Sequence, residues 1–114
     1  MVKELDRESV KAKLESDQPV VLVEALGTGY FEGGHLPGAV NIPHDQVDEL
    51  APSLLPDRNA EIIVYCASTT CRNSELAAER LVQLGYTNVA DYVDGKADWT
   101  EAGLPLEQDA PVAV

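Results

Sequence analysis

Cys66 opens a short loop that brings a thiol, hydroxyl groups and a guanidinium close together in the sequence. The loop follows an apolar, β-branched run at residues 61–65 and precedes a segment with helical periodicity at residues 73–84. In a parallel sheet, ligands bind beyond the carboxyl ends of the strands, where a following helix presents unsatisfied N–H groups. These amides and the positive end of the helix dipole lower a cysteine pKa from about 8.5. We therefore predict that Cys66 is a nucleophile near neutral pH.

The remainder of this loop is predicted to bind an anion. Its backbone amides can hold the terminal sulfur of a persulfide or an oxyanion, and Arg72 supplies a permanent cation with planar, bidentate geometry. The alternatives are that Cys66 is a small buried residue at a strand end and that Arg72 is solvated or salt-bridged. The expected catalytic residue is Cys66, and the expected anion-binding loop consists of Ala67, Ser68, Thr69, Thr70, Cys71 and Arg72.

Cys71 gives the loop a second thiol close to the first. Attack of Cys71 on a modified Cys66 would release the cargo and leave a disulfide, which requires Cα atoms within about 7 Å of each other. The alternative is that Cys71 is a small loop residue whose side chain points elsewhere. No metal site is predicted, because the two cysteines lack the C-x2-C spacing and only His35 and His44 could complete the ligand set.

The order of apolar runs and helical patterns defines the elements that position this loop. Runs bounded by turn residues alternate with amphipathic segments, which is typical of strand–helix units that build a parallel sheet between helical layers. We predict an α/β protein with a three-layer α/β/α fold and a mainly parallel sheet of about five strands. The expected strands are residues 19–23, 39–43, 61–65 and 88–92. One expected helix follows Asp6, and three more span residues 45–55, 73–84 and 96–102. Residues 27–38 are expected to form a loop with at most one short helical turn.

The composition is that of a single acidic domain. A chain of 114 residues with 45% hydrophobic content can build one core, which we assign to residues 1–106. Residues 107–114 have no periodic pattern and are expected to form a flexible tail. The formal charge of -12 disfavours binding to nucleic acid or to anionic membranes. No apolar run approaches the roughly 20 residues of a membrane span and no targeting segment is visible, so the expected location is the cytoplasm.

Three parts of the sequence resemble the rhodanese family. Residues 34–43 read GHLPGAVNIP, similar to the family signature GHIPGAxNIP, and strand 62–65 with Cys66 resembles the catalytic strand and its nucleophile. Residues 94–99 and 102–105 resemble the closing GGxxxW and AGLP segments. The resemblance covers residues 5–106 and implies a rhodanese fold that needs no cofactor, with the signature histidine, His35, in a structural role.

The resemblance also implies a sulfurtransferase with a two-step mechanism. Cys66 would take sulfane sulfur from a small donor such as thiosulfate or a persulfide and hold it as a persulfide. It would then pass the sulfur to a thiol or cyanide acceptor, or to a protein acceptor. A non-enzymatic module that carries sulfur or docks to a partner is an alternative from a different class.

Two departures from the family pattern concern the site. The loop is one residue longer than in many sulfurtransferases and has Ala67 after the cysteine, which makes thiosulfate the less expected donor. Its Cys-x5-Arg spacing resembles that of the cell-cycle phosphatases and arsenate reductases that share the fold, but the acidic composition and the lack of a general acid in the loop favour sulfur transfer. Glu24 and Ala25 stand where the family usually has Asp-x-Arg, so we expect the loss of an ion pair beneath the site.

Overall fold

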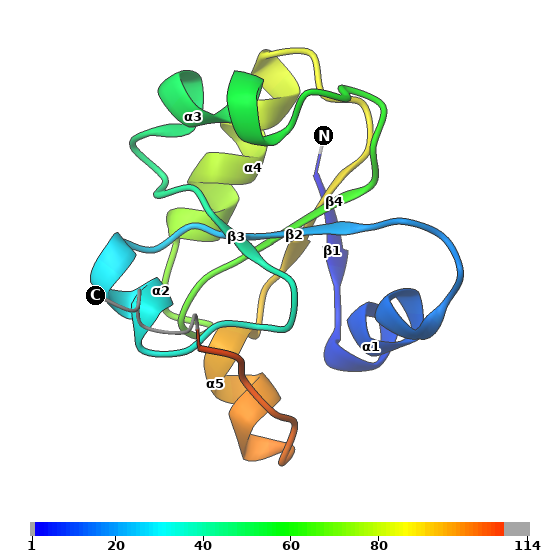
Figure 1. Ribbon diagram of the computed structural model, residues 1–114, viewed down its shortest axis with the longest axis vertical. Helices are drawn as coiled ribbons and strands as arrows, with labels where there is room; N and C mark the ends of the chain where they lie inside the picture. Colours follow the sequence, from blue (N-terminus) through cyan, green and yellow to red (C-terminus); the bar gives the residue numbers. More distant parts are fainter. Residues whose placement is uncertain (1, 109–114) are drawn as a thin grey trace, which may run out of the picture.

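One parallel sheet of five strands organises residues 2–108, the part of the chain that this computed structural model describes (Figure 1). The strands lie in the order β1-β5-β4-β2-β3, and every hydrogen-bonded pair of neighbours is parallel. The predicted sheet is therefore confirmed. The bounds of the strands are β1 Lys3–Leu5, β2 Val21–Glu24, β3 Val40–Asn41, β4 Ile62–Tyr65 and β5 Val89–Tyr92.

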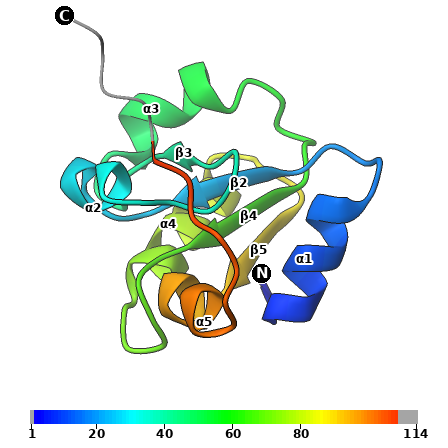
Figure 2. The same ribbon diagram turned by 60° about the horizontal axis from the view of Figure 1, so that its bottom comes forward.

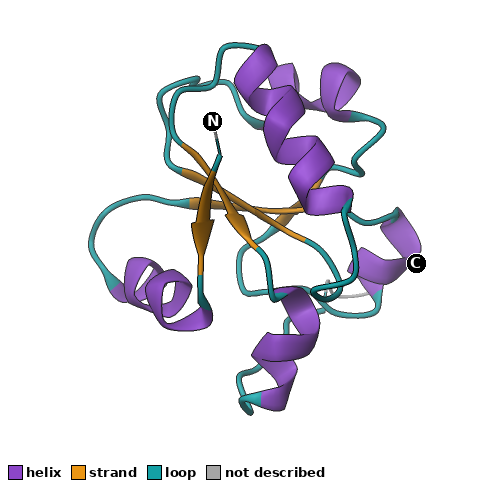
Figure 3. Cartoon of the chain, turned by 180° about the vertical axis from the view of Figure 1, so that it is seen from behind, coloured by secondary structure: helices purple, strands orange, loops and turns teal. Residues whose placement is uncertain are grey.

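Helices cover both faces of this sheet. They are α1 Arg7–Glu15, α2 Thr28–Glu32, α3 Val47–Leu54, α4 Asn73–Gln83 and α5 Gly95–Glu101. Successive side chains of a strand point to opposite faces, so Ile62 and Val64 of β4 enter the core beneath α3 and α4. Ile63 and Tyr65 enter the core that α1, α2 and α5 cover. Figure 1 shows α3 and α4 together, apart from α1 and α5, and Figure 3 shows the same separation from behind. The three-layer prediction is confirmed.

The expected strands and helices all occur, with bounds that differ by a few residues, and the short helical turn expected within residues 27–38 is α2. The sequence does not predict strand β1. Its residues carry no apolar run, pair with β5 at the edge of the sheet, and are mostly exposed. Charged side chains are common on such an edge strand, where half of the backbone faces solvent or a loop. Apolar periodicity therefore gives no signal for it.

The residues after α5 return to the loop that precedes β3. Glu107 exchanges backbone hydrogen bonds of 2.8 Å with His35 in both directions, and Gln108 Nε2 donates to the Gly33 carbonyl at 3.1 Å. The rest of the expected flexible tail, residues 109–114, lies outside the described residues, and the domain boundary at residue 106 stays a prediction. None of the helices within residues 2–108 is both long and apolar enough to span a membrane.

Tyr86 fixes the end of α4 against α3. Gly85 has a φ of +100°, as expected of the residue that ends a helix, and Tyr86 N donates back to the Leu81 carbonyl at 3.1 Å. The Tyr86 hydroxyl donates to the Leu55 carbonyl at 2.6 Å and lies 3.2 Å from the carbonyl of Ala51. It thereby satisfies a carbonyl at the end of α3 that has no partner within the helix.

We predict that Tyr86→Phe lowers the free energy of unfolding by about 1–3 kcal/mol, because it leaves a buried carbonyl without its donor. The measurement is urea denaturation followed by circular dichroism. Tyr30→Phe is the matched control, since that ring is 68% exposed, and it should change the free energy by less than about 0.5 kcal/mol. Equal effects of the two substitutions would contradict the assignment.

Candidate active site

The loop of Cys66 lies where the sequence predicts it, between the carboxyl end of β4 and the amino end of α4 (Figure 2). A turn closes the loop: Cys71 N donates to the Ser68 carbonyl at 3.1 Å, and the hydroxyls of Ser68 and Thr70 lie 3.0 Å apart. Thr69 and Thr70 are exposed, whereas Cys66 is buried. The turn therefore places the cysteine at the inner end of the loop.

The sulfur of Cys66 is shielded from solvent and has two acceptors for its proton. The residue is 0% exposed, and Sγ lies 3.2 Å from the Cys71 carbonyl oxygen and 3.4 Å from Ser74 Oγ. The backbone N–H of Ser74, in the first turn of α4, also faces the sulfur. Ser74 is not among the residues expected from the sequence. The sequence could have indicated Ser74 by its position two residues after the loop, because a hydroxyl in the first turn of the helix lies at the same helix end as the nucleophile.

This environment raises the pKa of the Cys66 thiol. Burial is the largest cause, because it penalises the charged thiolate, and the hydrogen-bonding side chain of Cys71 adds to it. The hydroxyl and amide of Ser74 lower the pKa without offsetting the rise. The prediction of a lowered pKa is therefore wrong for this structure, because burial of the sulfur outweighs the two groups of Ser74. The Cys71 carbonyl oxygen also accepts the thiol proton, where loop amides are expected.

Arg72 lies on the outside of the loop. Its side chain is 74% exposed, and Nη2 lies 3.1 and 3.2 Å from the two carboxylate oxygens of Glu75. The structure therefore shows the salt-bridged alternative for Arg72, and its contact with an anion at Cys66 stays a prediction. The reason is local, since Glu75 follows three residues later and presents its carboxylate to the residue that precedes α4.

The beginning of α5 holds the inner end of the loop, and Figure 2 shows α5 in orange beside it. Lys96 N donates to the Cys66 carbonyl and Ala97 N donates to the Ala67 carbonyl, each at 2.8 Å. Gly95 permits this approach, because its φ is +68° and a Cβ there would lie 2.5 Å from the Cys66 oxygen. In a planar trans peptide group, the N–H points in the direction opposite to the carbonyl. The N–H groups that share a peptide group with the Cys66 and Ala67 carbonyls therefore point away from α5.

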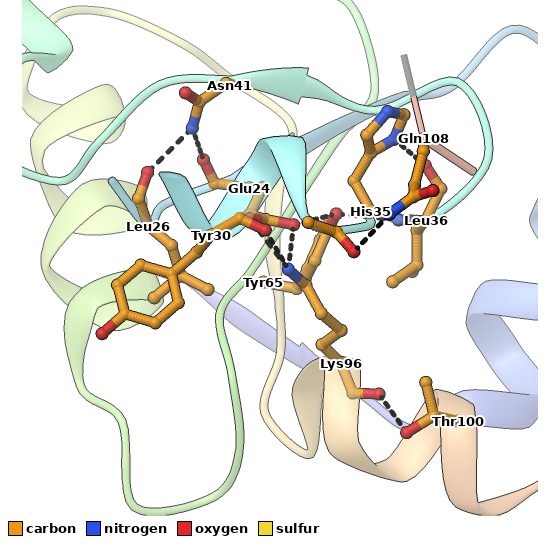
Figure 4. Close-up of polar contacts among 11 residues, drawn as sticks. Glu24, Leu26, Tyr30, His35, Leu36, Asn41, Tyr65, Lys96, Thr100 and Gln108 are labelled. Atoms are coloured by element: carbon orange, nitrogen blue, oxygen red, sulfur yellow. Dashed lines mark hydrogen bonds and ion pairs between the residues drawn. The ribbon is translucent and has the colours of Figure 1, made fainter. Parts of the chain in front are cut away.

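Glu24, at the end of β2, is a fully buried carboxylate beneath this loop (Figure 4). Lys96 Nζ lies 3.0 Å from each of its two oxygens and donates to the Tyr30 carbonyl at 3.1 Å. The Tyr65 hydroxyl donates to Glu24 Oε1 at 2.8 Å and accepts from Leu36 N at 3.0 Å. The expected loss of an ion pair is therefore wrong, because Lys96 supplies the cation from a distant part of the chain.

The signature segment, residues 34–43, supports the same network (Figure 4). The ring of His35 stacks on Phe31 with centroids 4.0 Å apart, and its Nδ1 is hydrogen-bonded to the Leu36 carbonyl at 2.8 Å. Asn41 Nδ2 donates to two carbonyls at the end of β2 and just beyond it, at 3.2 and 2.8 Å. The buried, stacked position of His35 confirms its predicted structural role.

The two thiols of the loop are both free. Cys71 is half-buried, and its side chain interacts with the Cys66 thiol. Its resolving role stays a prediction, because the structure shows the two residues before any reaction. Within residues 2–108, no group of three or more histidine, cysteine, aspartate or glutamate side chains is arranged to hold a metal ion.

Known proteins are similar to this chain in sequence and in fold. A model of the rhodanese-like domain matches residues 6–102. The putative sulfur carrier protein YrkF of Bacillus subtilis (strain 168) is 33% identical over 99 residues, which cover 87% of this chain and 51% of YrkF. A sulfurtransferase of Allochromatium vinosum is 29% identical over 106 residues, which cover 93% of this chain and 95% of that protein.

The solved structures agree with the sequence relatives. The crystal structure of a thiosulfate sulfurtransferase from Pseudomonas aeruginosa matches with a TM-score of 0.83 and 26% identity, over 96% of this chain and 21% of that one. The chain therefore belongs to the rhodanese-like domain family. It spans about half of YrkF, at 51%, and 21% of the Pseudomonas aeruginosa chain, so both are longer proteins.

We predict that Lys96→Met lowers the free energy of unfolding by about 3–5 kcal/mol, because it leaves the Glu24 charge buried without its cationic partner. Urea denaturation followed by Trp99 fluorescence measures the change. The double variant Glu24→Gln/Lys96→Met should recover most of the loss, since it removes both charges. Arg72→Ala, which breaks an exposed ion pair, is the control and should cost less than about 1 kcal/mol. A loss for Lys96→Met no larger than for Arg72→Ala would rule out the assigned role.

The raised pKa of Cys66 predicts how its alkylation depends on pH. Because the native site favours the protonated thiol, the curve of iodoacetamide rate against pH should lie at higher pH in the folded protein than in the unfolded chain. The Cys71→Ser variant leaves Cys66 as the one thiol, and the same variant in urea supplies the reference near pH 8.5. A folded midpoint below the unfolded one would show that the site stabilises the thiolate instead.

Proposed function

We propose that the chain transfers sulfane sulfur through a persulfide on Cys66. The observation that carries the proposal is a thiol at the carboxyl end of β4 that donates to the Ser74 hydroxyl at 3.4 Å, with the Ser74 backbone N–H beside its sulfur. Once the thiol proton has left, these two donors can stabilise the thiolate or a persulfide sulfur. Membership of the rhodanese-like family, and relatives named as a sulfurtransferase and a putative sulfur carrier, support the same chemistry.

The proposed reaction has two substitutions at sulfur. In the first, Cys66 loses its proton to solvent and the thiolate attacks the sulfane sulfur of the donor. The donor's sulfur–sulfur bond breaks, and its remainder leaves with the electron pair, as a thiolate from a persulfide or as sulfite from thiosulfate. In the second, a thiolate or cyanide acceptor attacks the terminal sulfur of the Cys66 persulfide and regenerates the Cys66 thiolate.

The first substitution requires the loop to move, because the Cys66 sulfur has no exposed surface. The Cys71 carbonyl must also turn away, since its oxygen accepts the thiol proton and would repel a thiolate. The carbonyls of Cys66 and Ala67 are held by α5. We therefore assign the movement to residues 68–72, which lie between this anchor and α4.

A persulfide is the proposed donor in preference to thiosulfate. Thiosulfate carries two negative charges, whereas the cation expected to receive them, Arg72, is paired with Glu75. The formal charge of -12 further disfavours a dianion. The same pairing of Arg72 disfavours phosphatase or arsenate reductase activity, because those substrates are also oxyanions.

For Cys71 we propose a resolving role in the same cycle. Cys71 follows five residues after Cys66 in the same loop, and its side chain contributes to the raised pKa of the Cys66 thiol, which supports an approach of the two sulfurs. Attack of the Cys71 thiolate on the inner sulfur of the Cys66 persulfide would form the Cys66–Cys71 disulfide and expel hydrosulfide. This reaction returns the cargo as sulfide when no acceptor thiol is present.

Intact mass spectrometry tests both proposals. After incubation with glutathione persulfide, the wild-type chain and Cys71→Ser should each gain the mass of one sulfur atom, and Cys66→Ala should gain none. Thiosulfate at equal concentration should give less adduct. After the donor is removed, the wild-type chain should lose the sulfur and two hydrogens, whereas Cys71→Ser should keep its adduct.

Several outcomes would contradict these proposals. The absence of any adduct with both donors, or an equal adduct on Cys66→Ala, would contradict sulfur transfer through Cys66. Equal lifetimes of the adduct on the wild-type chain and on Cys71→Ser would contradict the resolving role alone. Unfolding curves of the three proteins serve as the control, since a variant that does not fold would lose its adduct for an unrelated reason.

A further inference from the structure

A cleft of about 590 Å³ lies between β1, β5 and α4. Four carboxylates line it, and none of the lining residues is basic. Glu75 already pairs with Arg72, so the unbalanced charge belongs to the other three. The residues that matter here are the acidic Glu4, Glu75, Glu79 and Asp91 and the apolar Val2 and Val82.

Asp91 is the deepest of these carboxylates. It lies opposite Val64 in the register of β5 and β4, so its side chain points to the face that α4 covers. The residue is only 6% exposed, and its buried Oδ1 has no hydrogen-bond partner among residues 2–108. A buried carboxylate oxygen without a donor is costly. A cationic donor in the cleft would remove that cost.

The charges around Asp91 also favour a cationic ligand. Burial raises the pKa of its carboxyl most, the Ser74 hydroxyl lowers it in part, and the charges of Glu4 and Glu75 raise it further. The carboxylates that line the cleft repel one another, and a positive charge among them would be attracted by all of them. The cleft therefore favours a ligand that brings one or more N–H donors together with a positive charge.

The apolar residues narrow the chemistry of that ligand. Val2 and Val82 line the same cleft as the carboxylates, so part of the bound surface is a hydrocarbon wall. An ammonium group on a methylene chain fits both features, because it carries three donors on a stem that packs against apolar side chains. A metal ion would make no use of this wall.

We propose that the cleft binds an alkylammonium group, with the ammonium donating to Asp91 and the methylene chain lying against Val2 and Val82. This chemistry is shared by the side chain of a lysine in a protein partner and by a free polyamine. The cleft lies outside the Cys66 loop, although the Ser74 hydroxyl acts on both Cys66 and Asp91. Binding there does not depend on the proposed function. Binding should weaken as the pH falls through the pKa of Asp91, because the protonated carboxyl attracts no cation.

The test is a titration of the full chain followed by two-dimensional ¹H–¹⁵N NMR. One arm uses 1,5-diaminopentane, and the other uses a short peptide, blocked at both ends, that contains one lysine. At least one probe should give saturable shifts at the amides of Asp91 and Val82, and 1-pentanol, which lacks the charge, should give none. Saturation by the diamine alone indicates a free polyamine, and saturation by the peptide indicates a lysine side chain.

Substitutions separate a site from general attraction to an acidic protein. Asp91→Asn should weaken binding at least about tenfold, since it removes the charge that the ammonium contacts. Glu15→Gln makes the same change of charge at an exposed position of α1 and should leave binding within about twofold, as expected of a screened distant charge. If Asp91→Asn does not fold, the double variant Glu4→Gln/Glu79→Gln, at two exposed positions, takes its place with the same expected loss.

Three results would overturn the proposal. The first is the absence of saturable shifts with either probe at millimolar concentration. The second is binding to Asp91→Asn, or to the double variant, as tight as to the wild-type chain. The third is an equal loss for Glu15→Gln, which would show that the overall charge of the protein attracts the probes.

Discussion

A carboxylate that has lost all contact with water must find its neutralising partner and its hydrogen bonds inside the protein, and Glu24 is in that position. Its partners come from separate segments: Lys96 from α5 and Tyr65 from β4, with Leu36 joined through the Tyr65 hydroxyl. The backbone N–H of the same Lys96 holds the carbonyl of Cys66. The neutralisation of one charge on β2 therefore also fixes where α5 begins and where the nucleophile's loop starts.

Different groups around Cys66 favour its protonated and its deprotonated state. Burial and the Cys71 carbonyl favour the protonated thiol, whereas the hydroxyl and amide of Ser74 favour the thiolate. The hydroxyl and amide of Ser74 belong to α4, a regular helix. Burial and the position of the Cys71 carbonyl depend on a loop with exposed residues at its tip. A movement of the loop alone could thus shift the balance toward the thiolate without any change in the helix or the sheet.

The sequence predicts what depends on apolar pattern and on residue type. Buried strands such as β4 and the position of Cys66 after it are of this kind. Edge strand β1 is not, because its register with β5 is set by backbone pairing of mostly polar residues. The direction of the Cys71 carbonyl depends on backbone torsions that residue type does not determine. Lys96 could have been sought, since a glutamate that ends an otherwise apolar strand requires a cation, but only the fold shows which one lies near it.

The hydrogen bonds from α5 to the Cys66 and Ala67 carbonyls have a consequence for how such sites can diverge. One end of the loop is anchored by α5, and the other is the first turn of α4, so a residue inserted between them lengthens the exposed tip without displacing the sulfur. The length of the tip can then change while the nucleophile, Ser74 and the Glu24 network keep their positions. On this scaffold, the Cys-x5-Arg spacing is accommodated between two fixed ends of the loop.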